Sequence, residues 1–220
     1  MLWAALLAPL LFWLVRNQLL FGDPTASALK AERLGWGRTA FADLWSHPIF
    51  TPRGVYEFLT GLVPTFWRGE LAWHRIPLAW RSADLVYTVT TLVFVPLAVL
   101  GLRDPRGRDL RLAEGAALVA VLAALAILVV LSLVFAFHES SNPPVHHPYF
   151  VQGRLISGVM VPFALLYVRG LEVATSALPA RWRGRAAWGG LAALLALVAV
   201  SELSLSRVVF ASAYNWFHMP

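Results

Sequence analysis

The sequence from Gly115 to Phe137, GAALVAVLAALAILVVLSLVFAF, determines the class of the fold. It holds 23 consecutive residues without a charged side chain. At ~1.5 Å per residue, a helix of this length is long enough to cross the ~30 Å hydrocarbon core of a bilayer. This stretch therefore predicts a membrane-spanning helix, and the rest of the chain can be compared with it.

The composition agrees with that prediction. Of the 220 residues, 59% are hydrophobic and 14% are charged, which is too little polar surface for a typical cytosolic enzyme and too much apolar surface for a disordered chain. The chain has no cysteine, so disulfides and thiol chemistry are excluded. These features predict a polytopic membrane protein.

Four further segments are apolar enough to join the first as spans. The fold expected is an all-α bundle of about five transmembrane helices, in one membrane domain covering residues 1–220, with spans near 2–21, 84–102, 113–137, 154–171 and 186–205. Arg154 and Arg169 bound the fourth apolar segment, and their long side chains are expected to snorkel towards the interface.

The distribution of arginine predicts the orientation in a cytoplasmic membrane. Arginines crowd the loops at 103–111 and 181–185, whereas residues 138–152 contain neither Lys nor Arg. Because short cytoplasmic loops carry the basic residues, the N-terminus is expected inside and the C-terminus outside. We therefore interpret the net charge of +6 as a feature that orients the helices in the membrane. The sequence contains no nucleic-acid recognition motif, so we expect no nucleic-acid partner.

A long outer loop, residues 22–82, is expected after the first span. It is rich in tryptophan, a residue enriched where helices meet lipid headgroups, and the loop is therefore expected to contain interfacial helices. Its tryptophans are Trp36, Trp45, Trp67, Trp73 and Trp80.

The end of the first span holds the first candidate binding residues, Arg16, Asn17 and Asp23. From spacing alone, the default interpretation is a snorkelling arginine followed by an Asp-Pro turn. The alternative is an anion-binding arginine at the outer face, with Asp23 orienting it or a sugar hydroxyl.

The second candidates are Gly153 and Arg154, at the start of the fourth span. A guanidinium at a helix start can hold a phosphate through two parallel hydrogen bonds, and the helix dipole favours the anion. An arginine that only anchors the helix is an equal competitor.

The loop before Gly153 is rich in histidine but predicts no metal site. His146 and His147 are adjacent, so they point to different sides of most backbones, and an ordered turn is the default for this loop, which also holds His138 and Glu139. Glu202, near the end of the last span, is expected to lie exposed at the interface.

Two motifs carry a resemblance to a known family. The first motif is Arg16-Asn17 followed by Phe21-Gly22-Asp23-Pro24, and the second is the stretch Tyr149–Ile156 (YFVQGRLI) followed by Pro162. Together they resemble the C-terminal half of glycosyltransferases of the GT-C superfamily. Within that superfamily, the resemblance is to the bacterial DUF2142 group of membrane proteins. Tyrosine is common in the family where Phe21 and Leu155 stand in this chain.

The resemblance implies transfer of a sugar from a polyprenyl-phosphate donor at the outer membrane face, in cell-envelope glycan synthesis. It implies that Arg16 and Arg154 contact the phosphate, and the chemistry is compatible with a divalent cation. The family's catalytic base, an acidic residue, lies in the first outer loop of an N-terminal half, so this chain is expected to be a fragment or a split subunit with an unknown catalytic residue. The outer Asp23, Asp43, Glu57 and Glu70 are therefore not assigned as that base.

A different class of function stays open beside the enzyme. The alternative is a non-catalytic membrane protein that acts as a binding or assembly partner of another membrane subunit. A transporter is less favoured, because the apolar stretches of the central two spans, residues 85–102 and 115–137, contain no charge.

Overall fold

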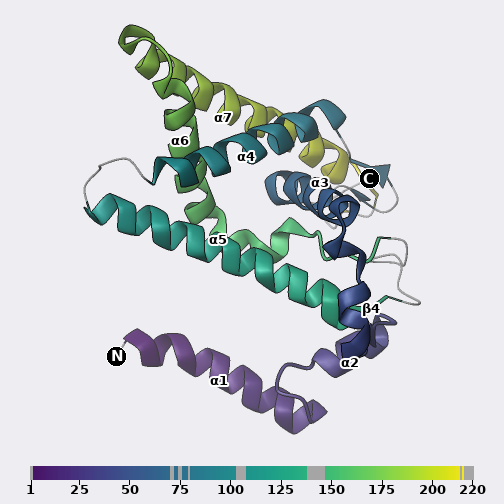
Figure 1. Ribbon diagram of the computed structural model, residues 1–220. Helices are drawn as coiled ribbons and strands as arrows, with labels where there is room; N and C mark the ends of the chain where they lie inside the picture. The colour runs from purple at the N-terminus through teal and green to yellow at the C-terminus, as the bar shows by residue number, and fades with distance from the viewer. Residues whose placement is uncertain are drawn as a thin grey trace. The chain divides into compact units, whose positions relative to one another are not determined.

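The computed structural model describes residues 2–69, 72–73, 76–78, 80–102, 108–137, 147–213 and 215 (Figure 1). Its long helices are α1 (Leu2–Phe21), α4 (Arg81–Gly101), α5 (Arg108–Val134), α6 (Met160–Ser176) and α7 (Ala180–Phe210). Four segments are long and apolar enough to cross a membrane: Arg81–Gly101, Asp109–Val134, Gly153–Ser176 and Ala180–Phe210. The prediction of an all-α polytopic helix bundle is confirmed. Helix α1 has the bounds expected for the first span, and its crossing of the membrane stays a prediction.

The remaining elements are helix α3 (Pro52–Arg68), which is as long as α6, and several shorter ones. The shorter elements are helix α2 (Ser27–Arg33), the 3-10 helices η1 (Phe41–Ser46), η2 (Pro48–Phe50) and η3 (Gly153–Val159), and two antiparallel pairs of two-residue strands. Strand β1 (Gly37–Arg38) pairs with β4 (Phe135–Ala136), and β2 (Ala72–Trp73) pairs with β3 (Ile76–Pro77). Because Phe135 and Ala136 leave the helix to form β4, the third span ends at Val134 and not at residue 137 as expected.

The chain divides into two compact units. Unit 1 comprises Met1–Phe50 and Val129–Phe150, and unit 2 comprises Thr51–Leu128 and Val151–Pro220. Unit 1 is held together beside the β1–β4 ladder by an aromatic cluster. The Trp36 ring lies 5.4, 5.8 and 5.1 Å from the rings of Phe135, Phe137 and Phe150. Trp36 is therefore half-buried against these rings, whereas Trp45 is exposed as an interfacial residue would be.

Helix α3 of unit 2 begins and ends on residues suited to those positions. The Thr51 hydroxyl accepts a hydrogen bond from the Gly54 backbone N–H at 3.0 Å, which caps the helix, and Pro52 occupies its first turn. Gly69 ends the helix with φ of 74°, a conformation that side chains disfavour. One face of α3 is buried, through residues that include Phe58, Leu62 and Arg68.

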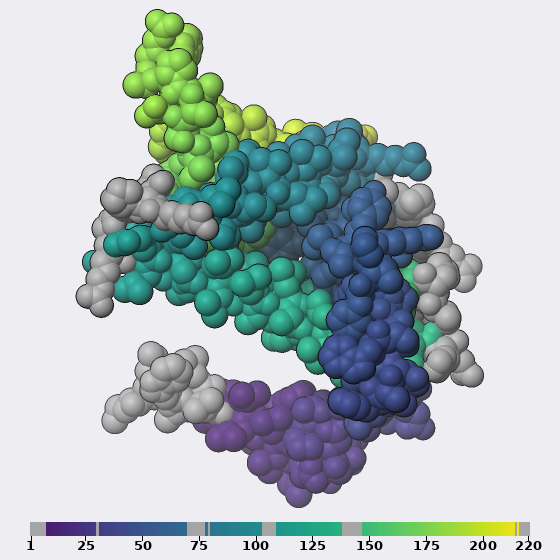
Figure 2. Space-filling model, in the orientation of Figure 1, coloured from purple at the N-terminus to yellow at the C-terminus, as the bar shows by residue number. Residues whose placement is uncertain are grey.

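The core of unit 2 lies where α4 packs against α6. Ala98, Val121, Phe163 and Leu166 are among its buried residues. Gly170 allows the two helices to approach closely, because a side chain there would overlap the Phe94 backbone. The outward faces of α4 and α5, teal in Figure 2, carry exposed leucine and valine side chains, as expected of helices that face lipid.

Candidate functional site

Gly153 is fixed by packing between η3 and α3. Its backbone N–H donates to the Thr65 hydroxyl at 3.0 Å, and the same hydroxyl donates a short hydrogen bond to the Val151 carbonyl. A Cβ at Gly153 would lie 2.6 Å from the Thr65 carbonyl carbon and nearer still to the Phe66 backbone. The absence of a side chain at position 153 is therefore explained by this contact without any ligand.

Arg154 is exposed at the start of η3. Its Nη2 donates to Gln152 Oε1 at 3.2 Å. Residues 153–159 form a 3-10 helix broken at Ile156, with φ of −114° and ψ of 18°, and the α-helix α6 begins only at Met160. Arg154 thus stands at the start of the Gly153–Ser176 segment, as expected, but the first turns of that segment are 3-10 helix, and the dipole of α6 begins six residues further along the chain.

An apolar cavity of about 190 Å³ lies next to η3 within unit 2. Side chains from α3, α4, α5, η3 and α6 line it, with Ile156 and Val159 contributed by η3. Among the described residues that line it, Thr91 alone carries a hydroxyl, and this hydroxyl accepts a hydrogen bond from Trp67 Nε1 at 3.0 Å. The cavity is partly open and suits a hydrocarbon chain better than a polar ligand.

Asn17 and Asp23 each make hydrogen bonds that hold the turn after α1, in unit 1. Asn17 is buried, and its Nδ2 donates to the Pro24 carbonyl at 3.2 Å. The Asp23 carboxylate accepts hydrogen bonds from the backbone N–H of Thr25 and Ala28, both at 2.9 Å. It also accepts from the hydroxyls of Thr25 and Ser27, at 2.8 and 3.0 Å.

These bonds give Asp23 a structural role at the start of α2. The backbone hydrogen bond from Ala28, followed by the bond from the Thr25 hydroxyl, lowers the pKa of the Asp23 carboxyl far below its ordinary value. Because each carboxylate oxygen already accepts two hydrogen bonds within the turn, Asp23 is ill suited to accept a proton from an incoming hydroxyl. Arg16 is not among the partners of Asp23 in the described chain.

Arg16 is exposed on α1. It lines a shallow groove with Phe12, Val15, Leu19 and Leu20, all on one side of the helix at spacings of three and four residues. Arg16 belongs to unit 1 and Arg154 to unit 2.

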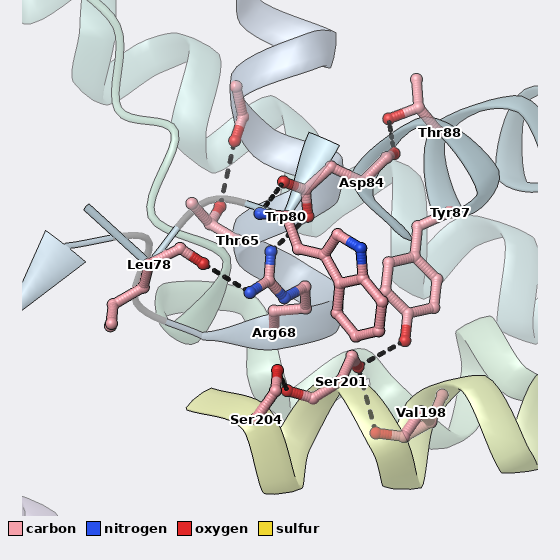
Figure 3. Close-up of polar contacts among 11 residues, drawn as sticks. Thr65, Arg68, Leu78, Trp80, Asp84, Tyr87, Thr88, Val198, Ser201 and Ser204 are labelled. Carbon is pink, nitrogen blue, oxygen red and sulfur yellow. Dashed lines mark hydrogen bonds and ion pairs between the residues drawn. The ribbon is translucent and has the colours of Figure 1, made fainter. Parts of the chain in front are cut away.

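A buried ion pair in unit 2 was missed in the sequence. Arg68, at the end of α3, places Nη1 2.7 Å from Asp84 Oδ1 and donates through Nη2 to the Leu78 carbonyl at 2.6 Å (Figure 3). Asp84 Oδ2 accepts from the Trp80 backbone N–H at 3.1 Å. The Arg68 side chain is only 1% exposed. The pair fixes the end of α3 to the first turn of α4, and spacing gave no signal for it.

Aromatic and hydroxyl contacts extend this junction to α7. The Trp67 ring stacks on Tyr87 with centroids 4.9 Å apart and an angle of 10° between the planes. The Tyr87 hydroxyl lies 2.7 Å from Ser201 Oγ, as Figure 3 shows. Ser201 is the buried residue of α7, and its neighbour Glu202 is exposed, as expected.

Arg169 does not snorkel, contrary to expectation. Its side chain is 3% exposed, its Nε lies 3.4 Å from Glu114 Oε1, and its Nη2 donates to the Gly101 carbonyl at 3.0 Å. The arginine thus joins the end of α4, the early part of α5 and α6. Glu114 at the start of a predicted span was the signal available, because such a charge needs a partner.

The candidate metal ligands of the histidine-rich loop are only partly described. His138, Glu139 and His146 lie outside the described residues, and the His147 ring packs edge-on against Tyr149 with centroids 4.8 Å apart. Within the described ranges, no three histidine or carboxylate side chains come together as a metal site would require.

Comparison with known proteins adds no relative. No family model matches the chain, and neither a curated protein nor a solved structure is similar to it.

Proposed function

We propose that this protein binds a polyprenyl-phosphate-linked sugar as the membrane part of a glycosyltransferase, with its isoprenoid chain in the apolar cavity of unit 2 and its phosphate on Arg154. The observation that carries the proposal is the position of η3. Its Ile156 and Val159 line the cavity, and Arg154 lies exposed two residues before Ile156.

The chemistry of this pairing supports an amphiphilic lipid. A polyprenyl phosphate combines a long hydrocarbon with a charged headgroup, and the cavity and the guanidinium supply one matching surface for each. The cavity is held in shape by the Arg68–Asp84 ion pair and by the Trp67–Thr91 hydrogen bond, both of which join α3 to α4.

A specific observation favours the alternative, a non-catalytic binding or assembly partner. Two carboxylates of the predicted outer loop are held in structural contacts, Asp23 in its turn and Glu57 2.8 Å from Arg53. Asp84, at the start of α4, is likewise held by Arg68. A glycosyl transfer requires a carboxylate that can accept the proton of the acceptor hydroxyl. In this alternative the chain presents the lipid to a catalytic subunit that supplies the base.

The test is photo-labelling of the full chain in lipid nanodiscs with a polyprenyl phosphate that carries a photoreactive group on its chain. Arg154→Ala removes the cation, and Val95→Phe places a larger side chain in the cavity. We expect Arg154→Ala to reduce labelling at least about tenfold, since loss of a charged hydrogen bond costs about 1.5–3 kcal/mol. We expect Val95→Phe to reduce labelling because the larger side chain occupies space that the isoprenoid chain needs. Arg53→Ala and Val93→Phe are matched controls, because both residues are exposed and neither lines the cavity.

The outcomes separate the two functions. Labelling lost in both test variants and kept in both controls supports lipid-phosphate binding, and a transfer assay on the complete system then distinguishes the enzyme from the presenting subunit. Equal labelling of all four variants contradicts the proposal. Labelling lost only in Val95→Phe would assign the cavity to hydrocarbon alone and remove Arg154 from the site.

A further inference from the structure

The start of α7 carries three exposed arginines within five residues, Arg181, Arg183 and Arg185. Trp182 lies among them with 47% of its surface exposed. We call these four side chains the arginine collar. It belongs to unit 2, and the cavity and Arg154 take no part in it.

The collar arginines are held in place by contacts within the collar and the turn before it. The guanidinium carbons of Arg181 and Arg185 lie 6.0 and 5.5 Å from the centre of the Trp182 ring, within cation–π distance. Arg183 donates through Nε to the Leu178 carbonyl at 2.7 Å. That bond leaves the terminal N–H groups of Arg183 available, so all three guanidinium groups retain donors for an external anion.

Within the described residues, the positive charge of the collar is not neutralised. Throughout the part of the chain that the structure describes, no carboxylate lies within ion-pair distance of Arg181, Arg183 or Arg185. The preceding acidic residue, Glu172, lies 3.4 Å from Arg169 instead. Three uncompensated guanidinium groups at one end of a membrane helix favour an anionic partner.

The length of α7 places the collar at the depth of the lipid headgroups. A helix of 31 residues is about 46 Å long, whereas the hydrocarbon core is ~30 Å thick. The uncharged part of the helix runs from Ala186 to Ser201, so the turns before Ala186 extend past the hydrocarbon. At that depth the collar arginines face phosphate groups and not acyl chains.

We propose that the arginine collar is a binding site for anionic phospholipids in the leaflet at this end of α7. Guanidinium groups bind phosphate oxygens through paired hydrogen bonds, which a compact ammonium cannot do. A zwitterionic lipid carries its own cation beside the phosphate and gains less from the collar. The collar therefore selects phosphatidylglycerol over phosphatidylcholine.

The test is a lipid titration of the full chain in detergent, followed by native mass spectrometry, with phosphatidylglycerol and phosphatidylcholine as the two probes. The double variant Arg181→Gln/Arg185→Gln is expected to lose affinity for phosphatidylglycerol about 25-fold, because each basic side chain near an anionic lipid contributes about fivefold. Affinity for phosphatidylcholine is expected to stay unchanged. Trp182→Leu, which keeps all three charges, is expected to weaken phosphatidylglycerol binding severalfold.

The matched control is Arg53→Gln/Arg207→Gln, which removes the same charge from exposed arginines outside the collar. Wild-type affinity in this control, with loss in the collar variants, supports the site. Equal loss in both double variants, unchanged affinity in both collar variants, or full competition by millimolar inorganic phosphate would overturn it. Because the photo-labelling experiment uses Arg154 and the cavity, the two proposals can fail independently.

Discussion

The Gly170→Ala substitution is the sharpest test of the core of unit 2. Gly170 lies on α6 where that helix crosses α4, and the crossing is close because position 170 has no side chain. A Cβ built there lies 2.6 Å from Phe94 Cα and nearer still to the Phe94 carbonyl carbon and oxygen. The neighbouring atoms belong to backbone, so no rotamer change can relieve the overlap.

The expected loss of stability follows from that geometry. Two carbon atoms prefer a separation of about 3.5–4.0 Å, so the helices must move apart by about 1 Å or more to admit the methyl group. Overpacking of side chains costs about 1–3 kcal/mol, and a clash with backbone belongs at or above the top of that range. The helix propensity of alanine returns at most about 1 kcal/mol. We therefore expect a net loss of about 2 kcal/mol or more.

Thermal unfolding in detergent, followed by the temperature at which half of the protein leaves the monodisperse peak, measures this loss. At about 2–4 °C per kcal/mol for a chain of this size, Gly170→Ala is expected to lower the midpoint by about 4–8 °C. Gly189→Ala is the control, because Gly189 is also in a spanning helix and its Cβ would meet no atom within 4 Å. Its midpoint is expected to stay the same or rise.

Two results would refute the reasoning. A Gly170→Ala protein as stable as the wild type would mean that α4 and α6 do not cross at this distance. An equal loss in Gly189→Ala would mean that the flexibility of glycine, and not close packing, is what the position requires.

Two other perturbations test the buried and exposed carboxylates. Arg169→Ala leaves Glu114 buried without its cation, so we expect it to lower the stability by about 3–5 kcal/mol in the same thermal assay. Arg183→Ala, at an exposed site, is expected to lower the stability by less than about 0.5 kcal/mol. Similar unfolding midpoints for the two variants would contradict the buried ion pair. For Asp23, the folded pKa lies below the unfolded value, so its contribution to α2 is present above about pH 4 and is lost as pH falls through the folded pKa. At pH 6, hydrogen exchange at the Ala28 amide is accordingly expected to be faster in Asp23→Ala than in the wild type. The difference in exchange rate between the two proteins is expected to be smaller at very low pH. If this difference grew on acidification, the carboxylate would not be what holds the turn.

The hydrophobic stretches predicted the helices well because a bilayer permits few backbone conformations. A run such as Gly115–Val134 must satisfy its backbone hydrogen bonds internally, and in a single segment only a helix does so. The ends of the spans were less predictable. Helix α5 stops at Val134 because Phe135 and Ala136 pair with a strand more than ninety residues earlier, and the local sequence holds no sign of that partner.

The polar contacts show a similar division. The Asp23 turn was predictable, because an Asp-Pro-Thr sequence provides its own hydrogen-bond partners within a few residues. The Arg68–Asp84 pair was not, since nothing in the sequence shows which of the many charges of the loop before Asp84 will pair with it. Gly153 was noticed in the sequence for a possible ligand, and the structure provides a packing reason for it in the contact with Thr65 and Phe66.

The Glu114–Arg169 pair also constrains how the chain is made. Arg169 follows Glu114 by 55 residues in the sequence. At a synthesis rate of ~5–20 residues per second, the carboxylate leaves the ribosome ~3–11 s before the guanidinium. During that interval α5 must be accommodated by the insertion machinery without its partner charge, and the arrival of α6 completes the pair. The order of helix insertion is thus coupled to a contact that only the later helix can supply.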